Sequence, residues 1–235
     1  MHHVKIIMPK TIHIVSSFIL VTAFSICARA NEPLLLSDSP LSGSAATLSL
    51  DSKSRSDGIW VDGSVGNGFL PWKREAGFSV GGAFATHDFG GRQPHDLVLS
   101  RAYIGWMLGP MVGGDHWYRG NFELIQDLFG GVQLSPTRYL VGETTLLRYS
   151  IATRTRWVPF MEFGGGSTLS DIGRPDLSPP YQFNLQIGPG VHYFWKKDCA
   201  LTAQFRYLHL SNAGIITPNQ GVNEMVFYAG LAWFF

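Results

Sequence analysis

Cysteines and charged residues are both scarce in this chain. Of its 235 residues only two are cysteines, and only 15% are charged. Cys27 lies in the apolar N-terminal segment, so Cys199 is expected to have no partner in the exported chain. An exported protein without disulfides must be stabilised by a large core or by a membrane.

Long hydrophobic runs are also missing. The apolar run of residues 14–26 is too short for a membrane-spanning helix, and no later stretch reaches the necessary length. This run follows two lysines and precedes the small residues around Arg29, an arrangement typical of a secretory signal. We therefore predict a signal peptide over residues 1–30 and an exported chain of residues 31–235.

The exported chain has no strong excess of either charge. Removing the three basic residues of the predicted signal leaves 15 basic and 17 acidic residues, a balance that argues against nucleic acid as a partner. Helix-period segments of ordinary length are not evident, whereas glycine is plentiful at 27 residues and aromatic residues reach 13%. This combination is typical of a membrane β-barrel with aromatic girdles on its outer wall.

Two regions follow the predicted signal. Residues 31–58 hold eight serines and few large apolar residues, which indicates a flexible lead segment. Residues 59–235 are predicted to form the barrel. We expect about eight strands, at roughly 72–86, 95–108, 117–130, 144–152, 156–166, 182–195, 199–211 and 224–235. Residues 59–66 are either a ninth short strand or a periplasmic lead-in.

Several of these segments alternate between apolar and polar side chains. In 183–195, for example, Phe183 and Leu185 share one face and Asn184 and Gln186 share the other. A soluble exported barrel that binds a lipid inside would have the apolar face inward, and an outer-membrane barrel would have it outward. The alternation itself is the same in both.

The C-terminus favours the membrane barrel. Apolar residues alternate back from Phe235 in the final VFYAGLAWFF, which resembles the signal that outer-membrane proteins present to the barrel assembly machinery. We therefore predict an all-β fold, an eight-stranded antiparallel transmembrane β-barrel of the bacterial outer membrane. Both termini of such a barrel are periplasmic, so its last loop, residues 212–223, is extracellular.

Beside this loop the sequence has a candidate nucleophile and base. His209 and Ser211 are two residues apart and share a strand face, which continues the lipid-facing series of Phe205 and Tyr207. In the next strand, counting back from Phe235 in steps of two places Asn223 on the lipid-facing side as well, and Glu224 on the interior side. A polar pair on the lipid face is costly unless it is used, and its depth matches the acyl esters of the outer-leaflet glycolipid.

Most other chemically interesting residues have plainer interpretations. The histidines outside this region show no metal-ligand spacing, and Gly164-Gly165-Gly166 precedes no helix, so it indicates a kink or turn in a strand. Six charged residues are predicted to form a paired network in the barrel interior. They are Arg101, Arg119, Glu123, Arg148, Glu162 and Arg206.

The motif around the last loop resembles that of the lipid A 3-O-deacylase family. It runs through His209-x-Ser211-Asn212-Ala213-Gly214, Pro218-Asn219 and Gly221-Val222-Asn223. The resemblance is strong over residues 183–235, diffuse over 59–182 and absent before them. It implies an eight-stranded outer-membrane esterase in which Ser211 is the nucleophile and His209 its general base. It also implies an oxyanion hole made by Asn212 and the backbone N–H of Gly214.

The sequence departs from the family pattern at the residue that orients the histidine. The family's glutamate aligns with Asn223, whose oxygen can still accept the imidazole N–H but carries no full charge. Glu224 becomes the alternative if a bulge shifts the register.

The resulting hypothesis is a serine esterase that removes an ester-linked hydroxyacyl chain from the lipid A of lipopolysaccharide, without metal or other cofactor. A non-enzymatic structural barrel and a soluble lipid-binding barrel are the alternatives.

Overall fold

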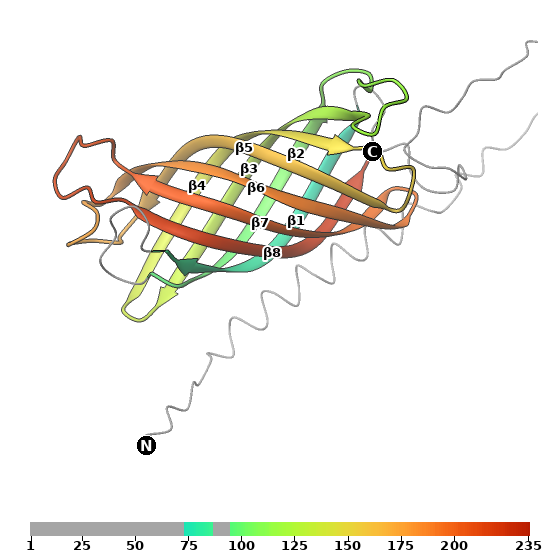
Figure 1. Cartoon of the computed structure of the whole chain (residues 1–235). Coiled ribbons are helices and arrows are strands. Elements are labelled where there is room, and N and C mark those ends of the chain that lie inside the picture. The colour runs from blue at the N-terminus through green and yellow to red at the C-terminus, as the bar shows by residue number, and fades with distance from the viewer. Residues whose placement is uncertain (1–72, 87–94) are drawn as a thin grey trace, which may run out of the picture. The chain divides into compact units, whose positions relative to one another are not determined.

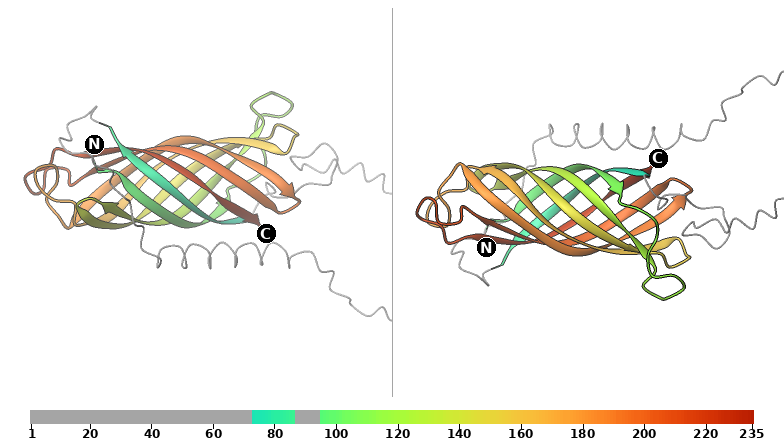
Figure 2. Two further views of the ribbon diagram at one scale, coloured as in Figure 1. Left: turned by 90° about the horizontal axis from the view of Figure 1, so that it is seen from below. Right: turned by 90° about the horizontal axis from the view of Figure 1, so that it is seen from above.

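The computed structural model describes residues 73–86 and 95–235, which form a closed barrel of eight antiparallel strands (Figures 1 and 2). Each strand pairs with the next along the chain, and β1 pairs with β8 to close the barrel. The strands are β1 (Arg74–Ala85), β2 (Leu97–Met107), β3 (Gly120–Leu134), β4 (Thr137–Ile151), β5 (Trp157–Ser170), β6 (Tyr181–Lys196), β7 (Cys199–Ser211) and β8 (Val222–Phe234). The predicted eight-stranded antiparallel barrel is confirmed.

Some predictions fall on other parts of the chain. The predicted signal peptide, the lead segment and the candidate strand 59–66 lie outside the described residues. Cys199 is buried at the start of β7 and is not a free thiol in the full chain. The prediction that it has no partner concerns the exported chain without residues 1–30 and stays a prediction. Cys27 lies outside the described residues.

The strand boundaries differ most from prediction in the β3–β4 hairpin. The sequence indicated a break over residues 130–136 and a strand from 144, but β3 continues to Leu134, which pairs with Thr137 across a tight turn. Gly131 appears as a turn residue in the sequence, but it lies within β3. A Cβ atom there would lie 2.3 Å from a side-chain carbon of Leu99, so any larger residue at this position would have to displace that buried leucine side chain.

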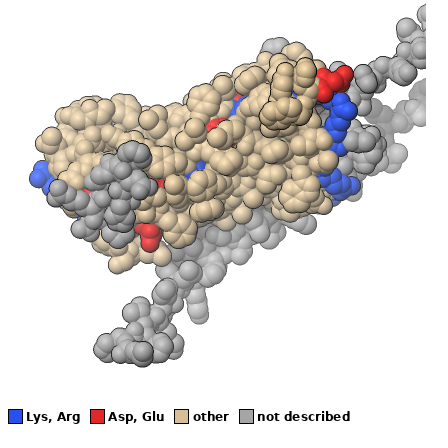
Figure 3. Space-filling model, viewed as in Figure 1, with Lys and Arg blue, Asp and Glu red and all other residues tan. Residues whose placement is uncertain are grey.

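The direction of the apolar faces identifies the outer wall as lipid-facing. Leu185 is 61% exposed and Leu128 60%, whereas the arginines at 148 and 206 are fully buried inside. Acidic and basic side chains are sparse on the visible wall, and basic ones collect at the end that holds the C-terminus (Figure 3). Within the described residues, no helix is long and apolar enough to cross a membrane. A soluble barrel has its apolar side chains inside and its polar ones outside, which is the reverse of what is found here. The alternative of a soluble lipid-binding barrel is therefore wrong.

A network of buried charges fills the middle of the barrel. Arg148 contacts Glu75 at 2.7 Å and Glu162 at 2.9 Å, and Arg206 contacts Asp127 at 2.7 Å. Arg101 and Glu123 join the same network, as predicted. Arg119 does not lie on a strand; it precedes β3 in the loop after β2. Because these side chains pack against one another, the barrel interior is a core.

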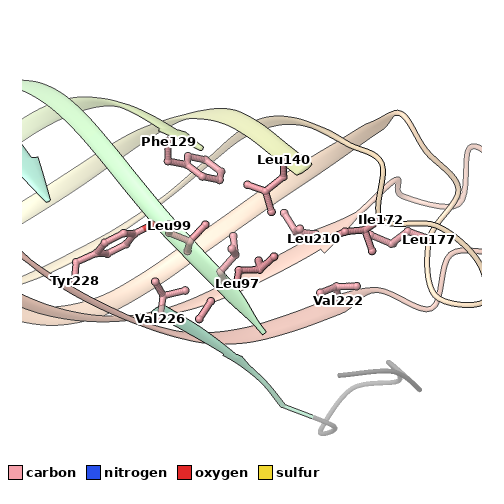
Figure 4. Packing of buried hydrophobic residues seen from close by; sticks show 12 residues of the cluster. Leu97, Leu99, Phe129, Leu140, Ile172, Leu177, Leu210, Val222, Val226 and Tyr228 are labelled. Atoms are coloured by element: carbon pink, nitrogen blue, oxygen red, sulfur yellow. The ribbon is translucent and has the colours of Figure 1, made fainter. Parts of the chain in front are cut away.

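An apolar cluster closes the barrel at the end opposite the C-terminus. It joins side chains of several strands with Ile172 and Leu177, which belong to the loop between β5 and β6 and are fully buried (Figure 4). The cluster includes Leu210 and Val222, which flank the last loop. This loop therefore emerges from a rigidly packed base.

Candidate active site

The end of β7 and the beginning of β8 bring His209, Ser211 and Asn223 onto the outer wall. His209 pairs with Asn223 across β7 and β8, and on the other side Ser211 pairs with Phe183 of β6. Burial alternates along β7, so that Leu208 and Leu210 point inward and the histidine and serine point outward, both half-buried. The pattern of facing is the one predicted from the sequence.

The imidazole of His209 is held by Asn223. The His209 Nδ1 and Asn223 Oδ1 atoms are 2.6 Å apart, which fits an Nδ1–H that donates to the amide oxygen. This tautomer leaves Nε2 free to accept a proton. Asn223 is itself 1% exposed, and its backbone carbonyl accepts a hydrogen bond from the N–H of Thr86 beside β1.

Glu224 faces the barrel interior. It pairs with Leu208 of β7, and neither of its carboxyl oxygens has a hydrogen-bond partner among the described residues. No bulge intervenes between β7 and β8 that would turn it toward His209. The side chain in contact with the imidazole is therefore that of Asn223.

The hydroxyl of Ser211 is held by the last loop. Its Oγ accepts a hydrogen bond from Asn219 Nδ2 at 3.0 Å and one from the backbone N–H of Ala213 at 3.1 Å. No hydrogen bond joins Ser211 to His209 within the described part of the chain, and such bonds often form only when substrate binds. The role of Asn219 was missed, although Pro218-Asn219 belongs to the motif that drew attention to the loop.

The two residues of the predicted oxyanion hole are hydrogen-bonded to the loop itself. Asn212 Nδ2 donates to the carbonyl of Ile216 at 2.8 Å, and the N–H of Gly214 donates to Asn212 Oδ1 at 3.0 Å. Both donors lie within three residues of Ser211 in the chain, but neither is free in this conformation. The donors that do converge on the serine oxygen are those of Asn219 and Ala213.

The loop follows a backbone path that favours glycine at two points. Gly214 and Gly221 have φ angles of 78° and 76°. A Cβ atom on Gly221 would lie 3.0 Å from Cε1 of the His209 ring. Glycine at this position therefore gives the imidazole its space.

A second extracellular loop supports the first. The N–H of Gln220 donates to the carbonyl of Asp176 at 2.7 Å, and the carboxyl of Asp176 lies 2.9 Å from Nε2 of His95. The other ring nitrogen of His95 contacts Gln133 of β3 at 3.0 Å. Asp176 thus links the loop before β6 and the segment before β2 to the loop that carries the serine.

The site combines a hydroxyl, an imidazole with one free nitrogen, and several N–H donors at the lipid-facing edge of the wall. This set is suited to acyl transfer. Among residues 73–86 and 95–235 there is no group of three or more His, Cys, Asp or Glu side chains that could hold a metal ion.

Comparison with known proteins agrees with this chemistry. Residues 104–232, more than half of the chain, match the family described as lipid A 3-O-deacylase. The crystal structure of the outer membrane enzyme PagL is 18% identical, with a TM-score of 0.49, covering 66% of this chain and 97% of that one. Neisserial surface protein A is 15% identical, with a TM-score of 0.46, covering 69% and 96%. No curated protein sequence is similar enough to count as a relative. The chain belongs to the lipid A 3-O-deacylase family of outer-membrane ester hydrolases.

Proposed function

We propose that this protein is a serine esterase that removes an ester-linked hydroxyacyl chain from lipid A, with Ser211 as nucleophile and His209 as general base. The observation that carries the proposal is the outward facing of both side chains at the extracellular end of β7. Only the outer surface of the barrel meets the acyl chains of a membrane glycolipid. A site at this level reaches their ester bonds without lifting the lipid from the membrane.

The first half of the reaction forms an acyl-enzyme. His209 Nε2 takes the proton of the Ser211 hydroxyl, and Oγ attacks the ester carbonyl carbon to give a tetrahedral intermediate. The C–O bond to the sugar then breaks, and the protonated imidazole gives its proton to the departing sugar oxygen. In the second half the same nitrogen takes a proton from a water molecule, whose oxygen attacks the acyl carbon. The bond from this carbon to Ser211 Oγ then breaks, the imidazolium returns the proton to Oγ, and the hydroxy fatty acid is released.

Asn223 orients the histidine during both halves. Its Oδ1 atom, 2.6 Å from Nδ1, keeps the proton on that nitrogen and so leaves Nε2 as the base. An amide oxygen stabilises the imidazolium less than a carboxylate does, because it carries only a partial charge.

The oxyanion requires donors that the loop must supply. Asn212 and Gly214 are the candidates from the family motif, and both must first release their bonds within the loop. Asn219 Nδ2 already points at the serine oxygen, so it is a third candidate donor. Each well-placed donor accelerates such reactions by about 10²–10³.

Mass spectrometry of lipid A tests the proposal. Cells of a host without such an enzyme would express the wild type or Ser211→Ala, and membrane insertion of both would be verified. Loss of one hydroxyacyl chain with the wild type alone is the expected result. Loss with both would move the nucleophile elsewhere, and loss with neither would favour the non-enzymatic structural barrel.

Export and assembly complete the proposal. Residues 1–30 would direct secretion and be cleaved, and the alternating C-terminal strand would be recognised by the barrel assembly machinery. The Phe235 side chain at its end is 40% exposed. Replacing Phe235 by Lys should reduce the amount of folded barrel in the outer membrane, as measured by fractionation.

A further inference from the structure

A strip of polar side chains crosses the lipid-facing wall on four neighbouring strands. Glu143 of β4 accepts hydrogen bonds from Gln126 of β3 at 3.0 Å and from the backbone N–H of Ser167 of β5 at 2.9 Å. Thr145 donates to Gln126 at 2.9 Å, and the Ser167 hydroxyl lies 2.9 Å from that of Tyr181 at the start of β6. Glu143 is the one acidic side chain on the outward faces of the eight strands described.

The strip begins beside the active site. Ser211 pairs with Phe183, Phe183 with Ser167, and Ser167 with Glu143, so these four residues form one row across β7, β6, β5 and β4. Neighbouring strands are about 4.8 Å apart, which places Ser167 roughly 10 Å around the wall from Ser211. Phe183 lies between them, and its ring packs edge to face against that of Tyr181.

The row descends toward the bilayer centre as it leaves the serine. Counted from the periplasmic end, Ser211 is residue thirteen of β7, whereas Glu143 is residue nine of β4. With the usual strand tilt of about 40°, Glu143 lies on the order of 10 Å deeper than Ser211. A carboxyl group at this depth faces acyl chains, and this placement is unfavourable unless another polar group meets it.

We propose that Glu143, Ser167 and Tyr181 form a subsite for the polar groups that hydroxyacyl glycolipids carry below their headgroup, namely acyl-chain hydroxyls and amide N–H groups. The inference rests on the proposed function. Ordinary phospholipid chains have no hydrogen-bond donors at this depth. A fixed acceptor there therefore selects a glycolipid with hydroxylated, amide-linked chains. It also holds the other acyl chains of that glycolipid next to the chain whose ester lies at Ser211.

The contacts of the strip suit an acceptor role. Each oxygen of the Glu143 carboxyl receives one hydrogen bond from the protein, and a carboxyl oxygen can accept a second. Gln126 and the Ser167 backbone fix its direction in advance, so little ordering is needed when a ligand binds. The hydroxyls of Ser167 and Tyr181 continue the polar track upward from Glu143.

Native mass spectrometry of detergent-solubilised protein tests the subsite without turnover. The Ser211→Ala chain would be offered equal amounts of hydroxyacylated lipid A and of the same diglucosamine glycolipid with unhydroxylated chains. Adding Glu143→Leu should lower the ratio of hydroxylated to unhydroxylated lipid bound by roughly tenfold. Ser100→Leu, which makes the same kind of change on the outward face of β2, should leave the ratio unchanged. Glu143→Gln keeps one acceptor oxygen and should retain part of the preference.

If circular dichroism shows that the Glu143→Leu chain is folded and its ratio of hydroxylated to unhydroxylated lipid bound is unchanged, the proposal is overturned. A shift in the monomer–dimer distribution without a change in lipid preference would assign the strip to self-association and would also overturn it. Failure of the esterase proposal has a different signature. In that case cellular lipid A is the same with wild type and Ser211→Ala, whereas the binding ratio still reports on the strip.

Discussion

Replacing Asn223 by aspartate should make the enzyme faster. The two side chains have the same shape, so the substitution would place a carboxylate oxygen at the present 2.6 Å from Nδ1 of His209. Asn223 Nδ2 is buried without a hydrogen-bond partner among the described residues, and the substitution also removes this donor. The imidazolium that forms in the transition state would then face a full negative charge.

The expected gain follows from the strength of the contact. A hydrogen bond between neutral groups contributes about 1 kcal/mol, and one that involves a charged group about 1.5–3 kcal/mol. The difference of ~0.5–2 kcal/mol corresponds to a rate increase of roughly 2- to 30-fold. Asn223→Leu removes the acceptor and should lower the rate by at least tenfold.

Release of hydroxy fatty acid from purified lipid A in detergent micelles measures both effects. Wild type, Asn223→Asp and Asn223→Leu would be compared at equal concentrations of folded barrel. Glu224→Gln is the matched control, because that neighbouring carboxyl faces the interior, away from the imidazole. If Asn223→Asp is folded and no faster than wild type, the assignment of Asn223 as the orienting residue is refuted.

Three other substitutions probe the support of the site. Gly221→Ala forces a Cβ atom against the His209 ring and should cut activity at least tenfold, whereas Gly114→Ala, also at positive φ but in open space, should not. Arg148→Leu leaves the buried carboxylates of Glu75, Glu123 and Glu162 without this partner, so it should lower the free energy of unfolding, measured by urea titration, by about 3 kcal/mol. The matched change at an exposed arginine, Arg154→Leu, should alter this free energy little. Asp176→Ala removes the side-chain contact with His95 but keeps the backbone carbonyl that accepts a hydrogen bond from Gln220. It should loosen the loop before β6 that supports the last loop, and so speed proteolysis of the last loop with the barrel intact; an unchanged cleavage rate would contradict this support.

The alternation of side chains determines much of this fold. Because the side-chain period of a strand is two, the sequence alone predicts eight strands and assigns His209 and Ser211 to one face. Counting from Phe235 likewise separates Asn223 from Glu224, and the register between β7 and β8 agrees. The boundaries of the β3–β4 hairpin were not predictable, because Gly131 lies within β3, where it packs closely against the Leu99 side chain of β2, and not in a turn.

Other features depend on contacts between distant segments, which only the tertiary structure supplies. Alternation is the same for a soluble and a membrane barrel, and the exposed apolar wall decided between them. The bond from Asn219 to Ser211 and the link through Asp176 depend on how loops fold back, for which a sequence has no period. The polar strip around Glu143 joins residues on four strands, and they become neighbours because closure of the barrel fixes one register for all eight.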